Sequence, residues 1–287
     1  MIIIRLYGGL GNQMFQYAFG RAVAEKLKTT LKLDLNWFNE ENRLSARNYE
    51  LSCFNVQENF ASDEEIEFCK MQKRNSMFGP MRKLLGKPKY YVGNYVEKEL
   101  FVYEKEVFNQ CINTYFDGHW QCYKYLEKIR EILLQEFSPK KNLKGINNAN
   151  SVSIHVRRGD YIHNSEVNKV HGLCSPDYYN RAINTIASKV INPHFFLFSD
   201  DIDWVKKNFQ INYPATAIDC NDINSGYIDM MLMKDCKHNI LANSSFSWWG
   251  AWLNKNPEKI VIAPDKWFND DRNTNDLILE DWIRINA

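Results

Sequence analysis

From residue 151 to residue 264, short runs of β-branched and aromatic residues alternate with segments of helical periodicity. Runs such as 194–199 (HFFLFS) and 259–264 (KIVIAP) have the length and composition of buried strands. This alternation predicts a parallel sheet with helices on both faces. The predicted strands are 152–156, 194–199, 215–219, 238–243 and 259–264, and the predicted helices are 176–190, 204–208, 226–237 and 248–254.

The first half of the chain opens with the same kind of unit. An apolar strand is predicted at 1–6, a turn rich in glycine follows, and a helix over 12–28 leads to a second strand at 31–35. Further on, Ser62 and the acidic residues after it indicate a helix start, and a helix is expected over 125–137, before Pro139.

The segment 138–150 (SPKKNLKGINNAN) has the composition of a linker, with little apolar content. We therefore expect two α/β domains, residues 1–140 and residues 150–287. The basic stretch 73–89 is expected to be a surface excursion.

Charge and cysteine content exclude several classes of protein. The 36 basic and 35 acidic residues give a formal net charge of +1, which argues against nucleic-acid binding by bulk charge. The seven cysteines are scattered without a Cys-x-x-Cys pair, which indicates free thiols in a reducing cytoplasm. No apolar run reaches the roughly 20 residues that a membrane-spanning helix needs. We expect a cytoplasmic protein, with association at the inner membrane surface left open.

The strand at 152–156 leads into an unusual motif, VSIHVRRGDY. It places His155, Arg157 and Arg158 at the carboxyl end of a strand, where open α/β sheets bind ligands. A guanidinium group is permanently charged and its planar fork of donors matches phosphate oxygens. The alternative is that one arginine only forms an ion pair with Asp160 and the other is solvated.

Other strands of the second half deliver polar residues at the same edge. A carboxylate there can accept hydrogen bonds from guanine, and serine hydroxyls with free helix amides can hold a phosphate. Together they predict a site for a guanine nucleotide diphosphate. The residues concerned are Asp200, Asp201, Asp219, Asn221, Asn243, Ser244, Ser245 and Ser247.

Two segments of the first half carry candidate sugar-binding groups. Asn12 and Gln13 follow the glycine turn and offer amides to a sugar, although Asn12 could instead be a helix N-cap. In the segment 115–121, Trp120 could stack on an acceptor sugar while neighbouring polar side chains bond its hydroxyls. The alternative is that Trp120 belongs to the core. The polar neighbours are Asp117, His119 and Gln121.

Three segments resemble the α-1,2-fucosyltransferases. They are HVRRGDY at 155–161, GGLGNQMFQYAFGRAVA at 8–24 and NSSFSWWGAWL at 243–253, so the resemblance covers essentially the whole chain. It implies two Rossmann-like domains that face each other across a cleft, the glycosyltransferase-B arrangement. It also implies an inverting transfer of L-fucose from GDP-fucose to a glycan hydroxyl, the 2-hydroxyl of a terminal galactoside being expected. The glycan would be an oligosaccharide or a lipid-linked chain.

The resemblance also suggests roles for individual residues. Arg157 is the phosphate arginine of the family, and His155, Ser245, Phe246 and Ser247 are expected around the donor. Asn12 and Gln13 are expected to meet the fucose and the acceptor. The general base is not fixed by the sequence, and Asp117 and Asp160 are both candidates. The residues expected to take part in catalysis are Arg157, Asp160 and Asn12.

Other functions remain open at this point. Asp201 and Asp203 have the spacing of a metal-dependent transferase of another nucleotide sugar, although the two arginines make a metal redundant. No cofactor or metal is therefore expected. Gly9 and Gly11, with Asp34 further on, suggest an NAD-dependent oxidoreductase, but Met14 stands at the third glycine position. A non-catalytic sugar-binding module would not need a phosphate site.

Overall fold

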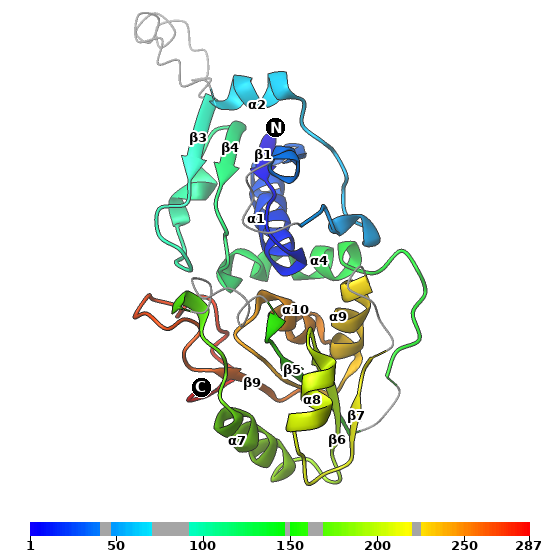
Figure 1. Cartoon of the computed structure of the whole chain (residues 1–287). Helices are drawn as coiled ribbons and strands as arrows, with labels where there is room; N and C mark the ends of the chain where they lie inside the picture. The colour runs from blue at the N-terminus through cyan, green and yellow to red at the C-terminus, as the bar shows by residue number, and fades with distance from the viewer. Residues whose placement is uncertain (41–46, 71–91, 147–149, 160–168, 220–224) are drawn as a thin grey trace, which may run out of the picture. The chain divides into compact units, whose positions relative to one another are not determined.

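The computed structural model describes residues 1–40, 47–70, 92–146, 150–159, 169–219 and 225–287. Two compact units emerge from its internal contacts. The first comprises Met1–Lys140 and Asn275–Leu277, and the second comprises Lys141–Thr274 and Ile278–Ala287 (Figure 1).

The first unit contains a parallel sheet of four strands in the order β2-β1-β4-β3. The predicted strand–turn–helix–strand unit at its start is confirmed. Two strands not predicted from the sequence, β3 and β4, complete the sheet. The elements are β1 (Ile2–Arg5), α1 (Leu10–Leu27), β2 (Leu31–Asp34), α2 (Asp63–Lys70), β3 (Val92–Val96), β4 (Asn113–Asp117) and α4 (Arg130–Glu136), with short 3-10 turns at Asn36–Asn39, Leu51–Cys53, Lys105–Asn109, Tyr123–Tyr125 and Glu127–Ile129.

Local sequence explains where α2 begins and how closely α1 packs on the sheet. In α2 the Ser62 hydroxyl accepts from the Glu65 amide at 3.3 Å, and the Glu65 carboxylate accepts from the Ser62 amide at 3.0 Å, which is a capping box. Helix α1 lies so close to the sheet that a methyl group at Gly20 would come within 2.8 Å of Leu31. A larger residue at position 20 would therefore push α1 off the sheet.

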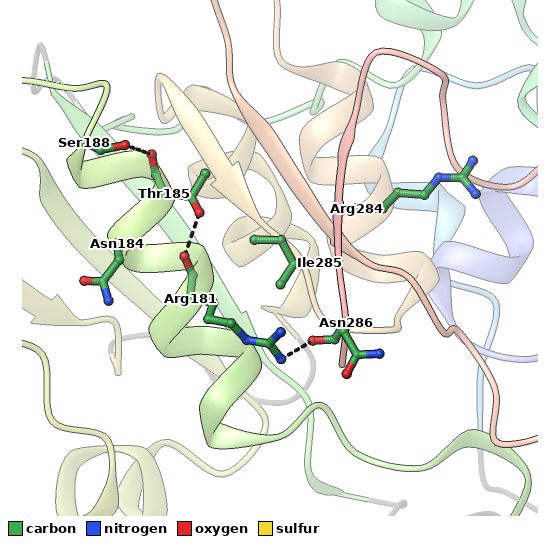
Figure 2. A pocket seen from close by; sticks show the side chains of 7 residues that line it. All are labelled: Arg181, Asn184, Thr185, Ser188, Arg284, Ile285 and Asn286. Atoms are coloured by element: carbon green, nitrogen blue, oxygen red, sulfur yellow. Dashed lines mark hydrogen bonds between the residues drawn. The ribbon is translucent and has the colours of Figure 1, made fainter.

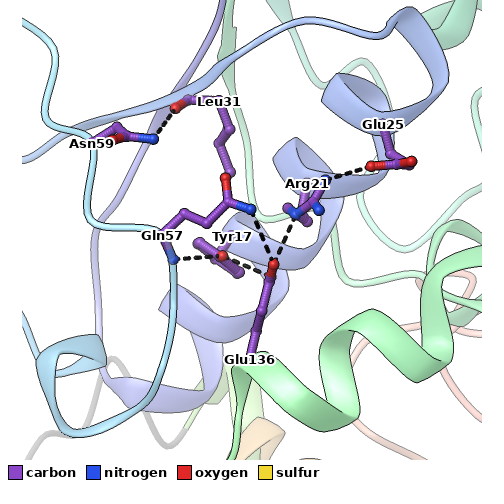
Figure 3. A network of polar contacts seen from close by, with 7 residues as sticks. All are labelled: Tyr17, Arg21, Glu25, Leu31, Gln57, Asn59 and Glu136. Atoms are coloured by element: carbon purple, nitrogen blue, oxygen red, sulfur yellow. Dashed lines mark hydrogen bonds and ion pairs between the residues drawn. The ribbon is translucent and has the colours of Figure 1, made fainter.

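A polar network fastens α4 to α1 (Figure 3). The Glu136 carboxylate accepts from the Tyr17 hydroxyl at 2.7 Å and from Arg21 Nε at 3.0 Å. The Gln57 side chain donates to the same carboxylate at 3.2 Å, and its backbone amide donates to the Tyr17 oxygen at 2.9 Å. Burial is the main cause that raises the pKa of Tyr17, so the phenol remains a donor. The network is structural and lies among residues of the first unit only.

The second unit contains a parallel sheet of six strands in the order β10-β9-β8-β5-β6-β7. The predicted alternation of strands and helices is confirmed, with shorter elements at several ends. The elements are β5 (Ser151–Val156), α7 (Pro176–Ala187), β6 (His194–Ser199), α8 (Ile202–Asn208), β7 (Ala215–Ala217), α9 (Gly226–Asp235), β8 (His238–Ile240), α10 (Ser245–Leu253), β9 (Val261–Pro264) and β10 (Ile283–Ile285).

Alternate residues of β5 and β6 face opposite layers of this unit. Ile154 and Leu197 pack with α7 and α8 in one hydrophobic cluster, whereas Phe198 packs with α9 and α10 in another. Gly250 allows α10 to lie close to α9, since a methyl group there would come within 3.0 Å of Met233 Cβ. The sheet is therefore covered on both faces, as the sequence predicts.

The helix predicted over 125–137 is only partly correct. Residues 123–129 form 3-10 turns, and the α-helix begins at Arg130. The reason is tertiary, because the Tyr123 amide bonds the Asp276 carbonyl at 2.9 Å and holds this part of the chain in a turn. The predicted surface excursion at 73–89 lies outside the described residues. Of the helices in the described residues, none has the length and apolar character that crossing a membrane requires.

Candidate functional site

The order of strands in the second sheet marks one position as a ligand site. From β5 the chain runs to β6 and β7 on one side and then returns to β8 on the other side of β5. Ligands of open α/β sheets bind at such a topological switch point, outside the carboxyl ends of the strands. The HVRRG segment leaves β5 at this point, and the segment from Ala242 to Ser247 leaves β8 beside it.

An ion-pair cluster holds the two arginines at the end of β5. Arg157 Nη1 lies 2.8 Å from Asp200 Oδ2, and the other oxygen of Asp200 accepts from the Arg158 amide at 2.9 Å. Arg158 Nε lies 3.3 Å from Asp201 Oδ2, and its guanidinium group stacks 3.4 Å from the centre of the Trp204 ring. Both arginine side chains are 18% exposed, so they reach the surface from fixed positions.

This cluster changes the expected role of two aspartates. The sequence predicts that one of Asp200 and Asp201 reads guanine, but the structure uses both carboxylates to fix the arginines. Asp201 also caps α8, because its Oδ1 accepts from the Trp204 amide at 3.2 Å. The expected pairing of Arg158 with Asp160 cannot be placed, because Asp160 and Asn221 lie outside the described residues. Asp219 follows β7, which is the edge strand of the sheet and lies away from the switch point, and its carboxylate pairs with Lys206.

His155 is buried beside this cluster, and one of its ring nitrogens meets no partner in the part of the chain that the structure describes. It is 4% exposed, its ring lies 5.5 Å from that of Phe246, and its Nδ1 meets no hydrogen-bond partner among the described residues. Burial lowers the pKa of His155 to about 4; the Asp200 carboxylate opposes this shift and the Arg157 charge adds to it. The imidazole is therefore neutral at pH 7, and its free nitrogen suits a hydrogen bond with a ligand.

The residues around the start of α10 divide into two groups. Ser245 and Phe246 are partly buried at the first turn, where Ser244 caps the helix by accepting from the Phe246 amide at 3.3 Å. Asn243 and Ser247 are instead buried and bonded to backbone carbonyls, Asn243 to His171 at 2.7 Å and Ser247 to Ser244 at 3.3 Å. Because both side chains are buried, they are not placed to contact a ligand as predicted. They instead hold the backbone of the loop before α10 through these hydrogen bonds.

The first sheet has its own switch point, between β1 and β4, because the chain runs from β1 to β2 on one side and adds β4 on the other. Arg5 Nη1 pairs there with Asp117 Oδ2 at 3.1 Å, and the two side chains are 28% and 29% exposed. The ring of Tyr7 meets that of His119 edge to face at 5.0 Å. The structure therefore brings Asp117 and His119 to one partly exposed edge.

Two amides predicted as sugar ligands lie at the same edge. Gln121 is itself buried, and its Nε2 donates to Asn12 Oδ1 at 2.8 Å, which joins the loop after β4 to the first turn of α1. The alternative reading of Asn12 as the N-cap is wrong, because Gly9 is the N-cap and no side chain caps this end. Asn12 remains partly exposed beside Gly8.

Two other predicted acceptor residues are placed in the interior. Gln13 is fully buried, and its amide donates to the Gly8 and Asn48 carbonyls at 2.9 Å each while accepting from the Glu50 amide. Trp120 is also fully buried, and its ring stacks on Phe19 at 3.9 Å. Neither side chain is positioned to touch a sugar, so both are corrected to structural roles.

Several residues of this edge were missed in the sequence. Arg5 and Tyr7 follow directly from β1, Trp37 lies after β2 with its ring 6.1 Å from that of Tyr7, and Glu97 follows β3. Arg5 and Tyr7 could have been found, because they leave a predicted strand at its carboxyl end. Glu97 could not, because β3 was not recognised as a strand.

The oxidoreductase alternative does not fit the first unit. Asp34, the expected ribose ligand, is 2% exposed, and its two oxygens accept from the Tyr115 hydroxyl at 2.7 Å and the Asn36 amide at 2.9 Å. Because this carboxylate is buried and its two bonds hold it inside the first unit, a ribose could reach it only if the packing around it opened.

A hollow on the second unit contains none of the predicted site residues. It lies over α7 and β10 (Figure 2). Arg181 there donates to the Asn286 carbonyl at 2.8 Å, and the side chain of Arg284 points away from the others and donates to the Ile278 carbonyl. The switch point of the sheet is the better candidate site.

Comparison with known proteins identifies the family. The family model described as glycosyl transferase family 11 matches residues 1–286. The chain belongs to glycosyl transferase family 11. The resemblance to the α-1,2-fucosyltransferases is thereby confirmed, and the protein is a glycosyltransferase.

Relatives of this family 11 enzyme include bacterial and mammalian proteins. An α-1,2-colitosyltransferase of Escherichia coli is 36% identical over 300 residues, covering 99% of each chain. The Escherichia coli O-antigen biosynthesis glycosyltransferase WbnK is 36% identical over 305 residues, covering 98% of this chain and 99% of its own. The galactoside alpha-(1,2)-fucosyltransferase 2 of Sus scrofa is 26% identical over 189 residues, covering 61% of this chain and 55% of its own.

The metal-dependent alternative rests on Asp201 and Asp203. Asp201 already uses one oxygen as a helix cap and the other in the pair with Arg158, so its carboxylate is poorly suited to bind a metal as well. Among the described residues, no group of three or more His, Cys, Asp or Glu side chains could hold a metal ion. Metal independence stays a prediction.

Proposed function

We propose that this family 11 enzyme transfers L-fucose from GDP-fucose to the 2-hydroxyl of a terminal galactoside, with inversion at the anomeric carbon. The observation that carries this proposal is the cluster at the switch point of the second sheet. It combines a fixed guanidinium group, a neutral histidine with a free nitrogen and the first turn of α10. The name of the Sus scrofa relative, a galactoside alpha-(1,2)-fucosyltransferase, supports fucose as the transferred sugar and a galactoside as the acceptor.

The proposed chemistry of the donor site centres on Arg157. As the bond between the anomeric carbon and the β-phosphate oxygen breaks, negative charge grows on the departing phosphate. A guanidinium group already oriented by Asp200 stabilises that charge without reorganising. His155 would bond the nucleotide through its free nitrogen, and Ser245 and Phe246 would line the diphosphate and the fucose.

The acceptor is proposed to bind at the switch point of the first sheet. The supporting observation is the partly exposed edge that carries Asp117, His119 and Asn12, with the buried Gln121 bonded to Asn12. Carboxylate, imidazole and amide groups together offer the donors and acceptors that a sugar's hydroxyls need. The resemblance of the three motifs to the α-1,2-fucosyltransferases supports a fold of glycosyltransferase-B type with two Rossmann-like units.

Colitose is a second candidate for the transferred sugar, because a relative with 36% identity is named a colitosyltransferase. Colitose is L-fucose without its 3-hydroxyl group. A site that hydrogen-bonds this hydroxyl rejects the analogue lacking it by roughly 10⁴–10⁵-fold, whereas a site that leaves it unbound discriminates little. Comparing kcat/KM for the two GDP-sugars separates the two candidates.

Donor binding tests the proposal without knowledge of the acceptor. The melting temperature of the purified protein, measured in EDTA, should rise when GDP-fucose is added, because a ligand that binds the folded state stabilises it. GDP-mannose should shift the melting temperature less, and NADH should leave it unchanged. Stabilisation by NADH alone would contradict the proposal, and a response to GDP-fucose that requires Mn²⁺ or Mg²⁺ would favour the metal-dependent alternative.

Gly159→Ala should slow the reaction by disturbing the arginine cluster. A methyl group at this position would clash with Asp200 Oδ2, the atom that pairs with Arg157. Such overpacking shifts the carboxylate that orients Arg157, and a misplacement of about 1 Å can cost about 10²-fold in rate, so we expect kcat to fall by about tenfold or more. Steady-state kinetics measure the effect.

Gly226→Ala is the matched control in the same unit. A methyl group at Gly226 would approach its nearest neighbour, a ring carbon of Phe246, only to 3.8 Å, which is an ordinary contact. This variant should keep most of the activity. If both variants lost activity equally, the effect would not come from Asp200.

The protein is further proposed to work in the cytoplasm on an oligosaccharide or a lipid-linked glycan. The support is the cysteine content, since the six cysteines among the described residues are free thiols.

A further inference from the structure

Glu97 lies at the carboxyl edge of the first sheet, directly after β3. Its backbone amide bonds the Asp117 carbonyl at 2.9 Å, so Glu97 continues the pairing of β3 with β4 for one more residue. The side chain is partly exposed and lies on the same edge as Asp117, Tyr7 and His119. It is thus part of the surface where the acceptor is proposed to bind.

The loop after β4 is built around this carboxylate. Glu97 Oε2 accepts from the His119 amide at 2.6 Å, and Oε1 accepts from the Trp120 amide at 3.2 Å. The wrapping is so close that a methyl group at Gly118 would lie 2.5 Å from Glu97 Cβ. Trp120 has a φ of +56°, a conformation that is costly for a residue with a side chain.

These contacts fix the position of the carboxylate but do not use all of its accepting capacity. A carboxylate has about four lone-pair sites, and two backbone amides occupy two of them. Each oxygen therefore keeps one direction in which it can accept from a ligand hydroxyl. Proton transfer to a side chain requires a proton-accepting group that is held in place and can be reached by the substrate, and the Glu97 carboxylate is held in this way and is partly exposed.

The charges around Glu97 favour a proton acceptor that works near neutral pH. Burial, followed by the charges of Glu104 and Asp117, raises the pKa of Glu97 to about 7, against the lowering effect of the two amides. The uncharged side chains of Tyr7 and Tyr125 also lie in its field. Glu97 forms no ion pair with a described residue, whereas Arg5 is held by Asp117 and Glu40 and Lys98 lies over the Tyr95 ring.

We infer that Glu97 is the general base of the transfer, and this inference rests on the proposed function of the acceptor edge. Glu97 takes the proton of the attacking hydroxyl while the hydroxyl oxygen forms its bond to the anomeric carbon. The bond from that carbon to the β-phosphate oxygen breaks, and its electron pair leaves with GDP. Asp117 is held in an ion pair with the Arg5 guanidinium group, whereas Glu97 pairs with no cation among the described residues.

A pH profile tests the inference. Glu97 accepts a proton only when it is ionised, so kcat/KM of the wild-type enzyme should rise with pH through about 7 and then level off. Glu97→Gln should lower kcat on the order of 10²-fold and remove the rising limb. Glu97→Asp, which keeps a carboxylate, should retain the limb at a reduced rate.

Asp117→Asn provides a second, independent test. It removes a negative charge that raises the pKa of Glu97, so the rising limb should move to lower pH. This result does not depend on whether Glu97→Gln folds. A limb that stays in place in Asp117→Asn, or a folded Glu97→Gln that keeps both its limb and a rate within threefold of wild type, would overturn the inference.

Donor binding separates this outcome from failure of the proposed function. Glu97→Gln should keep the thermal shift produced by GDP-fucose, because Glu97 is proposed to act on the acceptor. If the wild-type protein transferred no sugar from a GDP-sugar, the proposed function itself would fail. If the wild type is active and Glu97 variants behave as it does, only the assignment of the base is wrong.

Discussion

Arg157→Lys is expected to lower kcat by about 10²–10³-fold, the usual cost of losing one well-placed electrostatic donor. Lysine keeps the positive charge but not the planar fork, and it cannot reproduce the 2.8 Å contact with Asp200 in the same geometry. Because the bonds of Arg157 to the β-phosphate strengthen as the donor bond breaks, the loss should appear in kcat more than in donor affinity. Steady-state kinetics together with a donor thermal shift measure the two quantities.

Arg158→Lys is the matched control for this prediction. Arg158 stacks on Trp204 and pairs with Asp201, so its replacement should mainly lower the melting temperature. Its kcat should fall much less than that of Arg157→Lys. Equal and small effects at the two positions would mean that the arginine pair is structural.

Trp120→Ala is expected to destabilise the protein by about 3–5 kcal/mol, the range for removing a large buried aromatic side chain. The ring is fully buried and stacks on Phe19 with an interplanar angle of 3°. It also meets Phe116 edge to face, so its loss opens a cavity between α1 and β4. Denaturant unfolding with Phe19→Ala for comparison measures the effect.

Trp37→Ala is the corresponding control at the acceptor edge. Trp37 is partly exposed and its ring lies 6.1 Å from that of Tyr7. Its loss should change stability much less and should raise the KM for the acceptor. If Trp120→Ala remained as stable as wild type and lost only acceptor binding, Trp120 would stack on the acceptor sugar, and its assignment to the core would be wrong.

The fold of the second unit could largely be predicted because its local signals agree. HFFLFS and VSIHV are strands by composition and alternation, and Pro176 starts α7 after Ser175, which caps the helix by accepting from the Tyr178 amide at 3.1 Å. The end of β5 could be recognised as a ligand site for the same reason, since its arginines follow a strand that the sequence defines.

The strands β3 and β10 were missed because their sequences carry weak local signals, whereas β4 (NTYFD) contains the strand formers Thr, Tyr and Phe and could have been recognised. β3 (VGNYV) contains a glycine and an asparagine, both poor strand formers, and β10 has only three residues, Ile283–Ile285, at a sheet edge. Pairing with a neighbour stabilises them, and the sequence does not show which neighbour is present. Glu97 was overlooked with β3.

The sequence also does not show which residues the charged and aromatic side chains contact. Asp200 follows a strand end and could as well read guanine as hold Arg157, and the choice depends on β6 lying beside β5 in register. Trp120 stands among polar residues, and only the packing of α1 on β4 shows that its ring is internal. Tertiary contacts decide such cases, because the residue types alone fit both roles.

The most direct test of the central claim is the structure of the product. The purified protein, in EDTA, is incubated with GDP-fucose and a terminal β-galactoside, and the product is analysed by NMR spectroscopy. The account predicts release of GDP and an α-L-fucosyl group on the 2-hydroxyl of galactose. A β-L-fucosyl product, or transfer from another nucleotide sugar with none from GDP-fucose, would contradict it.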